Sequence, residues 1–160
     1  MKYFKKLLMT VFALFFLLAF GNAQNNSSGL RLTPQEIEAI APNEAGAGTS
    51  GVSGIKTRIL KGDPTKDGLY TIQLTVPANT KIQAHTHPDD RVATVVSGIW
   101  QIGYGSRFDE KKLKALAPGS FYTEQPNVAH FARTGKTPVV VQITGYGPTG
   151  TEYVDLKENK

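Results

Sequence analysis

The feature that most constrains the fold is a series of short β-type segments between residues 55 and 156. Segments such as LYTIQLTV (69–76), RVATVV (91–96) and PVVVQIT (138–144) are rich in Val, Ile, Thr and Tyr, which are the residue types that strands favour. Turn-forming sequences such as KGDPTKDG (61–68) separate them. Closely spaced short strands are typical of a β-sandwich or a closed barrel, so the sequence predicts an all-β fold.

Three segments depart from this β pattern. At residues 33–40, Thr33 is followed by a proline, and Glu36 stands three positions after it; this order predicts a short helix that begins with a capping box. The charged segment 108–116 (FDEKKLKAL) predicts a short helical connector that covers one end of the barrel. The glycine-rich residues 43–54 predict a connector with little structure of its own.

The first 23 residues have the anatomy of a signal peptide. Three lysines precede an apolar run at 7–20, and small residues follow up to Ala23. The run is shorter than the ~20 residues that a membrane-spanning helix needs. We therefore predict cleavage after Ala23 and a periplasmic or secreted protein with no stable membrane anchor after cleavage. The alternative is an uncleaved anchor.

Three parts follow from these patterns: a signal peptide (1–23), an N-terminal arm with a short helix (24–54) and a β-barrel domain (55–160).

The whole chain has 18 basic and 13 acidic residues. Removing the leader with its three lysines leaves 15 basic and 13 acidic residues, a net charge of +2. Such a small charge without a basic stripe excludes a nucleic-acid partner. Because the chain has no cysteine, an apolar core must stabilise it.

Three histidines are the candidate metal ligands. His85 and His87 stand two positions apart at the end of a predicted strand, and residues two apart in a strand point to the same face. Imidazole binds Zn, Cu, Fe and Ni, so one divalent cation would satisfy both rings. His130 lies in a second predicted strand and could complete the site from across the barrel. The alternative is that the His-Thr-His tripeptide is a polar strand end at the surface.

The residues around these histidines resemble the two motifs of the cupin family. The first motif is matched by His85, His87 and Gly98, and the second by Gly119, a proline and His130. The resemblance implies a cupin-type β-barrel or jelly roll, with a short N-terminal helix and a short helical connector. It also implies one divalent transition metal (Fe, Mn, Zn, Ni or Cu) inside the open end of the barrel, and a homodimer.

One position departs from the family pattern: Arg91 stands where the first motif has a glutamate. Guanidinium cannot be a metal ligand. Three explanations are open: a three-histidine site with free positions, a site in which Glu124 replaces the missing carboxylate, or an anion site without metal. Arg91 could face inward, next to Asp89, Asp90, Glu124 or a substrate carboxylate, or it could lie outside the barrel mouth. We interpret Asp89 and Asp90 as solvated turn residues.

Two classes of function are consistent with this sequence. The first is an enzyme with dioxygenase-, isomerase- or lyase-type chemistry on a small organic substrate, in which His85, His87 and His130 hold the metal. Arg91 would orient an anionic group of the substrate, and Glu124 would be a ligand or a proton acceptor. The second is a binding protein that holds a metal or a small molecule without turnover. A structural barrel with a degenerate site is a third, inert alternative.

Overall fold

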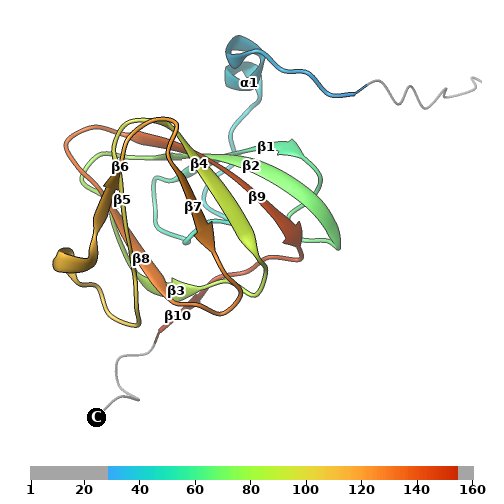
Figure 1. Cartoon of the computed structure of the whole chain (residues 1–160). Coiled ribbons are helices and arrows are strands. Elements are labelled where there is room, and N and C mark those ends of the chain that lie inside the picture. The colour runs from blue at the N-terminus through green and yellow to red at the C-terminus, as the bar shows by residue number, and fades with distance from the viewer. Residues whose placement is uncertain (1–28, 155–160) are drawn as a thin grey trace, which may run out of the picture. The chain divides into compact units, whose positions relative to one another are not determined.

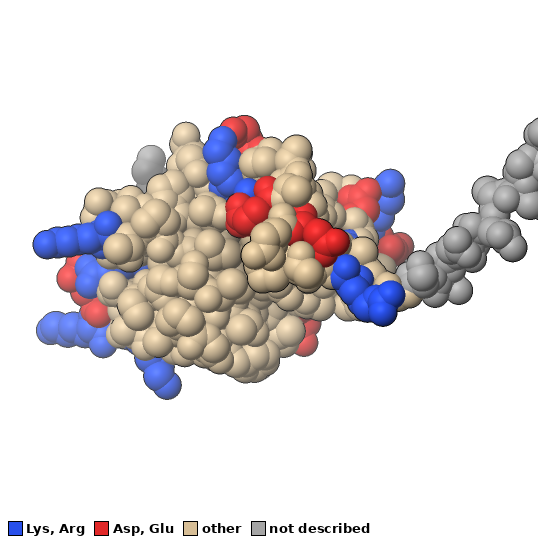
Figure 2. All heavy atoms as spheres, turned by 90° about the horizontal axis from the view of Figure 1, so that it is seen from above, with Lys and Arg blue, Asp and Glu red and all other residues tan. Residues whose placement is uncertain are grey.

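The structure is a computed structural model that describes residues 29–154. The predicted signal peptide and its cleavage site lie outside these residues. The chain divides after Arg31, and the helices and strands below all belong to the unit Leu32–Lys160. Among the residues described, no helix has the length and hydrophobicity needed to cross a membrane. On the face seen in Figure 2, basic and acidic side chains are mixed and form no continuous basic stripe.

The strands in the described part of this unit form two antiparallel sheets of five strands each (Figure 1). The first sheet has the strand order β1 (Lys56–Lys61), β2 (Gly68–Val76), β9 (Val139–Gly147), β4 (Arg91–Ser97) and β7 (Phe121–Glu124). The second has the order β10 (Glu152–Tyr153), β3 (Lys81–Thr86), β8 (His130–Thr134), β5 (Trp100–Tyr104) and β6 (Lys114–Leu116). The predicted all-β fold is confirmed.

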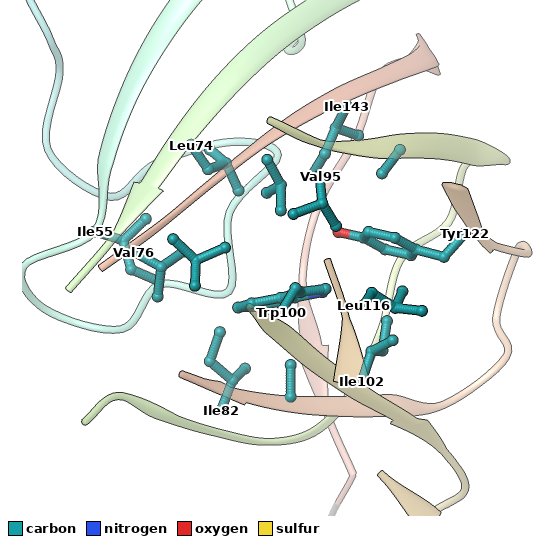
Figure 3. Close-up of a cluster of buried hydrophobic side chains, with 14 of the residues drawn as sticks. Ile55, Leu74, Val76, Ile82, Val95, Trp100, Ile102, Leu116, Tyr122 and Ile143 are labelled. Carbon is teal, nitrogen blue, oxygen red and sulfur yellow. The ribbon is translucent and has the colours of Figure 1, made fainter. Parts of the chain in front are cut away.

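Alternation along the strands builds the core between the two sheets. In β9, for example, Val139, Val141 and Ile143 are buried, and the residues between them are partly exposed. Burying each such side chain stabilises the fold by about 1.5–3 kcal/mol. Figure 3 shows how side chains from both sheets meet around Trp100. The cluster includes Ile55, Leu74, Val76, Ile82, Val95, Trp100, Ile102, Leu116, Tyr122 and Ile143.

One predicted helix is confirmed in full, and the other is confirmed over a single 3-10 turn only. The helix α1 (Pro34–Ala39) begins with the capping box, in which the Thr33 hydroxyl accepts from the Glu36 backbone and the Glu36 carboxylate accepts from the Thr33 backbone. The segment 108–116 instead contains one 3-10 turn, η1 (Glu110–Lys112), and strand β6. Pairing of β6 with β5 places Leu116 opposite Trp100. This tertiary contact overrides the local helical pattern.

The glycine-rich connector at residues 43–54 is more ordered than the sequence predicts. Asn43 forms an isolated antiparallel bridge with Thr57. Thr49 and Ser50 are buried, and the Thr49 hydroxyl donates to the carbonyl of Gly46 at 2.8 Å. The bridge to Thr57 reaches outside the connector, whereas the hydrogen bond between Thr49 and Gly46 lies within it. The connector contains no helix or strand, so the expectation of little structure of its own holds, and contacts with other parts of the chain add the order.

Candidate metal centre

The three histidines meet at one end of the barrel interior. His85 in β3 pairs with His130, the first residue of β8, and His87 follows β3 by one residue. The ring centroids lie 4.9 Å (His85 to His87), 4.4 Å (His85 to His130) and 5.2 Å (His87 to His130) apart. One nitrogen from each ring lies within 4.8 Å of the other two, and all three side chains are buried. The structure thus brings the predicted ligands together.

An irregularity in β3 helps to aim the histidines inward. The pairing of β3 with β8 shifts register between Ile82 and His85. Both of these residues line the same cavity, although regular alternation would send residues three apart to opposite faces. The register shift therefore lets β3 present an apolar residue and then a histidine to one interior.

Each imidazole is oriented by a backbone carbonyl. A carbonyl oxygen only accepts hydrogen bonds, so each Nδ1 donates and each Nε2 keeps its lone pair. Nε2 of His87 and Nε2 of His130 are buried without a hydrogen-bond partner. A divalent metal is a partner that such lone pairs can share. The acceptors are the carbonyls of Gln83 for His85 (2.8 Å), Gly150 for His87, and Val128 for His130 (3.2 Å).

Burial keeps two of these rings neutral. Burial, together with the neighbouring His130, lowers the pKa of His85 to about 4. Burial and the charge of Arg91 lower the pKa of His87 to about 3. Both rings are therefore neutral near pH 7, the state in which imidazole binds a metal.

Arg91 points into the barrel and forms a buried ion pair. It begins β4 directly opposite Glu124, which ends β7. The side chain is 2% exposed, and its Nη2 donates to Oε2 of Glu124. Nη1 donates to the carbonyl of Gly48 at 3.0 Å. The alternative that places Arg91 outside the barrel mouth is therefore wrong, and Glu124 is its partner.

Glu124 lies beside the histidines as well as Arg91. Its Oε1 is 3.6 Å from Nε2 of His130, and its Oε2 is 3.8 Å from Nε2 of His87. Burial alone would raise the pKa of Glu124. The Arg91 guanidinium, and after it His130 and His87, have the larger effect and lower the pKa to about 2. This ionised carboxylate therefore lies beside two of the three imidazoles, those of His87 and His130, whereas the cluster of metal-type ligands consists of the three histidines.

Asp89 is a buried carboxylate, although the sequence predicts a solvated one. The expectation of a solvated carboxylate holds for the exposed Asp90 but is wrong for Asp89, which is 6% exposed. Asp89 accepts from the hydroxyls of Tyr70 (2.6 Å) and Thr149 (2.5 Å). A Cβ at position 145 would lie 2.6 Å from Oη of Tyr70 and 2.7 Å from Oδ2 of Asp89. The glycine at 145 was the signal in the sequence, because it leaves room for this pair.

The histidines open onto a small cavity inside the barrel. Its volume is about 30 Å³, which is room for about two water molecules. One end is polar and contains the three histidines, Arg91 and Glu124. The remainder of the lining is mainly apolar and includes Ile55, Leu74, Val76, Ile82, Trp100, Ala132, Val141 and Ile143.

Comparison with known proteins gives structural matches and no sequence matches. No family model matches the chain. No curated protein matches it either. Among solved structures, the polyketide cyclase RemF from Streptomyces resistomycificus is 16% identical, with a TM-score of 0.61; the match covers 80% of this chain and 87% of that one. A cupin 2 conserved barrel domain protein from Rhodopseudomonas palustris is 13% identical, with a TM-score of 0.59 and coverage of 80% and 86%.

A third similar structure is the DMSP lyase DddQ from Ruegeria pomeroyi, which is 17% identical with a TM-score of 0.56. The match covers 72% of this chain, which spans only 61% of the length of that lyase. At these identities the likeness shows the fold alone. The protein has the cupin fold, a jelly roll of two antiparallel sheets, with a buried three-histidine cluster at one end.

Proposed function

We propose that this protein binds one divalent transition metal through His85, His87 and His130 and acts on a small organic anion at that metal. The observation that carries the proposal is the pair of buried Nε2 atoms, on His87 and His130, that have no partner. Leaving such polar atoms unpaired is unfavourable, and one ion satisfies both. When bound, the metal would act as a Lewis acid that polarises an oxygen of the substrate.

Glu124 is our candidate for the fourth ligand. The family motif supplies a carboxylate from the position that Arg91 occupies here. Arg91 and Glu124 are direct neighbours across the β4–β7 pair, so a carboxylate on β7 reaches almost the same place. Arg91 would then hold the outer face of that carboxylate and keep it ionised.

The charges around the cluster favour an anionic substrate. A divalent ion and Arg91 carry three positive charges, against two negative charges on Glu124 and Asp89. The resulting net positive charge is buried in a region of low dielectric, where electrostatic attraction to an anion is strong. Three proteins with similar folds are named as a lyase, an isomerase and a cyclase. A similar fold does not determine the reaction of this chain.

The proposal is tested by metal analysis of the purified protein. After dialysis against Mn²⁺, Fe²⁺, Ni²⁺ or Zn²⁺ and removal of free ions, we expect close to one ion per chain. A variant with His87→Ala and His130→Ala should bind none of them, because its remaining donors cannot hold the ion. Less than one-tenth of an ion per wild-type chain in every metal would contradict the proposal.

A metal-binding protein without turnover is the second candidate function. The small cavity favours it, because a volume of about 30 Å³ leaves little room for an organic substrate beside a metal. Oxygen uptake and product formation with catechol, flavonol and keto-acid substrates separate the two. Turnover that disappears in His130→Ala supports the enzyme, and tight metal binding with no turnover in any assay supports the binder.

We also propose that the protein is exported, on the strength of the leader-like residues 1–23. The full chain expressed in a Gram-negative host should accumulate in the periplasm with Gln24 as its first residue. Recovery of an intact N-terminus from the cytosol would contradict this.

A further inference from the structure

Within the connector at residues 43–54, residues 46–52 form part of the wall of the candidate metal centre. Gly48 supplies the carbonyl that accepts from Arg91 at 3.0 Å. Ser50 lines the same cavity as the three histidines. A segment that the sequence presents as a loose linker therefore contributes directly to the site.

Two residues of the C-terminal segment hold this connector in place. The hydroxyl of Thr151 donates to the carbonyl of Thr49 and lies 3.3 Å from Nδ1 of His87. The hydroxyl of Tyr153 donates to the carbonyl of Ser50 at 2.7 Å, and its ring centroid is 5.5 Å from that of His85. The backbone of Ser50 is thus fixed next to the histidine cluster, and its side chain is placed with it.

The Ser50 side chain has no partner in this wall. The residue is 6% exposed, and its Oγ is buried without a hydrogen bond. The Nε of Arg91, which borders the same cavity, is also buried and unpaired. Arg91 Nε can only donate, and a serine hydroxyl can donate. When a metal is bound to the histidine nitrogens, Ser50 Oγ and Arg91 Nε still have no partner. An acceptor at this end of the cavity would satisfy both.

We propose that Ser50 is a ligand-positioning residue, whose hydroxyl donates, together with Nε of Arg91, to the oxygen atoms of a carboxylate group bound at the histidine cluster. This inference rests on the proposed function, because the carboxylate is held partly by the metal. A carboxylate has two oxygen atoms, so it can accept from both of these donors at once. The inference goes beyond an anionic substrate in general, because it names the group recognised and a residue of the connector that recognises it.

The test uses the whole chain loaded with Co²⁺ and titrated with formate, the smallest carboxylate. The visible absorption of Co²⁺ reports both metal binding and changes at the metal when formate enters. We expect the Ser50→Ala variant to bind Co²⁺ as the wild type does, with the same formate-free spectrum. Its formate affinity should fall about tenfold or more, as expected for loss of a hydrogen bond to a charged group.

Two further variants control for the connector itself. Ser53, three residues along and exposed, gives the matched control: Ser53→Ala should bind formate as the wild type does. Ser50→Thr keeps the hydroxyl and should restore most of the affinity lost in Ser50→Ala, which separates hydrogen bonding from any change in folding.

The outcomes separate this inference from the proposed function. If the wild type binds Co²⁺ but formate leaves its spectrum unchanged, or if Ser50→Ala binds formate as tightly as the wild type, the inference is wrong and the metal site stands. If Ser50→Thr loses formate as fully as Ser50→Ala, the hydroxyl is not the cause and the inference is wrong. If the wild type does not bind Co²⁺ at all, the metal proposal fails, and this inference fails with it.

Discussion

The two ends of the barrel interior differ in chemistry although the same strands build both. On three strands, a buried apolar residue and a buried polar residue stand two positions apart, with the polar one nearer the histidine end. This holds for Ala93 and Arg91 on β4, Tyr122 and Glu124 on β7, and Ala132 and His130 on β8. The apolar end stabilises the fold by removing hydrocarbon from water. The polar end buries charges and unpaired nitrogens, which costs stability. The comparison teaches that the costly groups are gathered at the end of the barrel where the three histidines could bind a metal.

The largest effect should come from breaking the buried ion pair. Replacing Arg91 with Met leaves the Glu124 carboxylate buried without its partner, which lowers the free energy of unfolding by about 3–5 kcal/mol. Urea unfolding followed by circular dichroism measures this. The matched control is Glu110→Gln, which breaks the exposed pair with Arg133 and should cost less than about 1 kcal/mol. Equal losses in the two variants would mean that burial does not distinguish the polar end.

The apolar end should respond to loss of volume and leave the metal unaffected. Ile143→Ala removes a buried side chain from the core, and we expect a loss of about 2–5 kcal/mol in the free energy of unfolding. Because Ile143 makes no polar contact at the histidines, the Zn²⁺ affinity of the folded variant should remain within about threefold of the wild type. A tenfold fall in Zn²⁺ affinity would show that the two ends are coupled.

The polar end should also make the metal-free protein sensitive to acid. The pKa values of His85 and His87 are about 4 and about 3 in the folded chain and ~6.5 when unfolded. The unfolded state therefore binds protons first. Stability is greatest above pH 6.5 and is lost as the pH falls towards these folded values, by about 2 kcal/mol per ring between pH 7 and pH 5.

Urea titrations at several pH values in the presence of a chelator measure this loss. His85→Gln combined with His87→Gln should flatten the slope, because these two titrating groups are removed. Saturating Zn²⁺ should raise stability at pH 7 by about 2.7 kcal/mol at one hundred times the dissociation constant. A pH dependence that survives in the double variant would assign the acid sensitivity to other groups.

The sequence predicts the fold and the ligands better than it predicts their surroundings. Strand alternation is local and predicts the all-β class, and the spacing of His85 and His87 predicts that they share a face. The addition of His130, 43 residues further along, rests on the resemblance to the cupin motifs. The sequence leaves the direction of Arg91 open, because its partner Glu124 lies 33 residues away. The sequence does not reveal the burial of Asp89 for the same reason: its partners Tyr70 and Thr149 are 19 and 60 residues distant.

The connector is the clearest case of this limit. Glycine-rich residues predict weak local structure, and locally that is correct. Order comes instead from Thr151 and Tyr153, about one hundred residues further along the chain. Only folding brings these hydroxyls to the carbonyls of Thr49 and Ser50, and no pattern within the connector encodes the contact.

The most direct test of the account is a crystal structure of the Zn²⁺-loaded protein, with anomalous scattering data collected on both sides of the zinc absorption edge. We predict one anomalous peak inside the barrel, about 2.0–2.1 Å from Nε2 of His85, His87 and His130, with Glu124 in contact or one water away. A barrel without this peak, or a zinc ion bound only at surface carboxylates, would contradict the account.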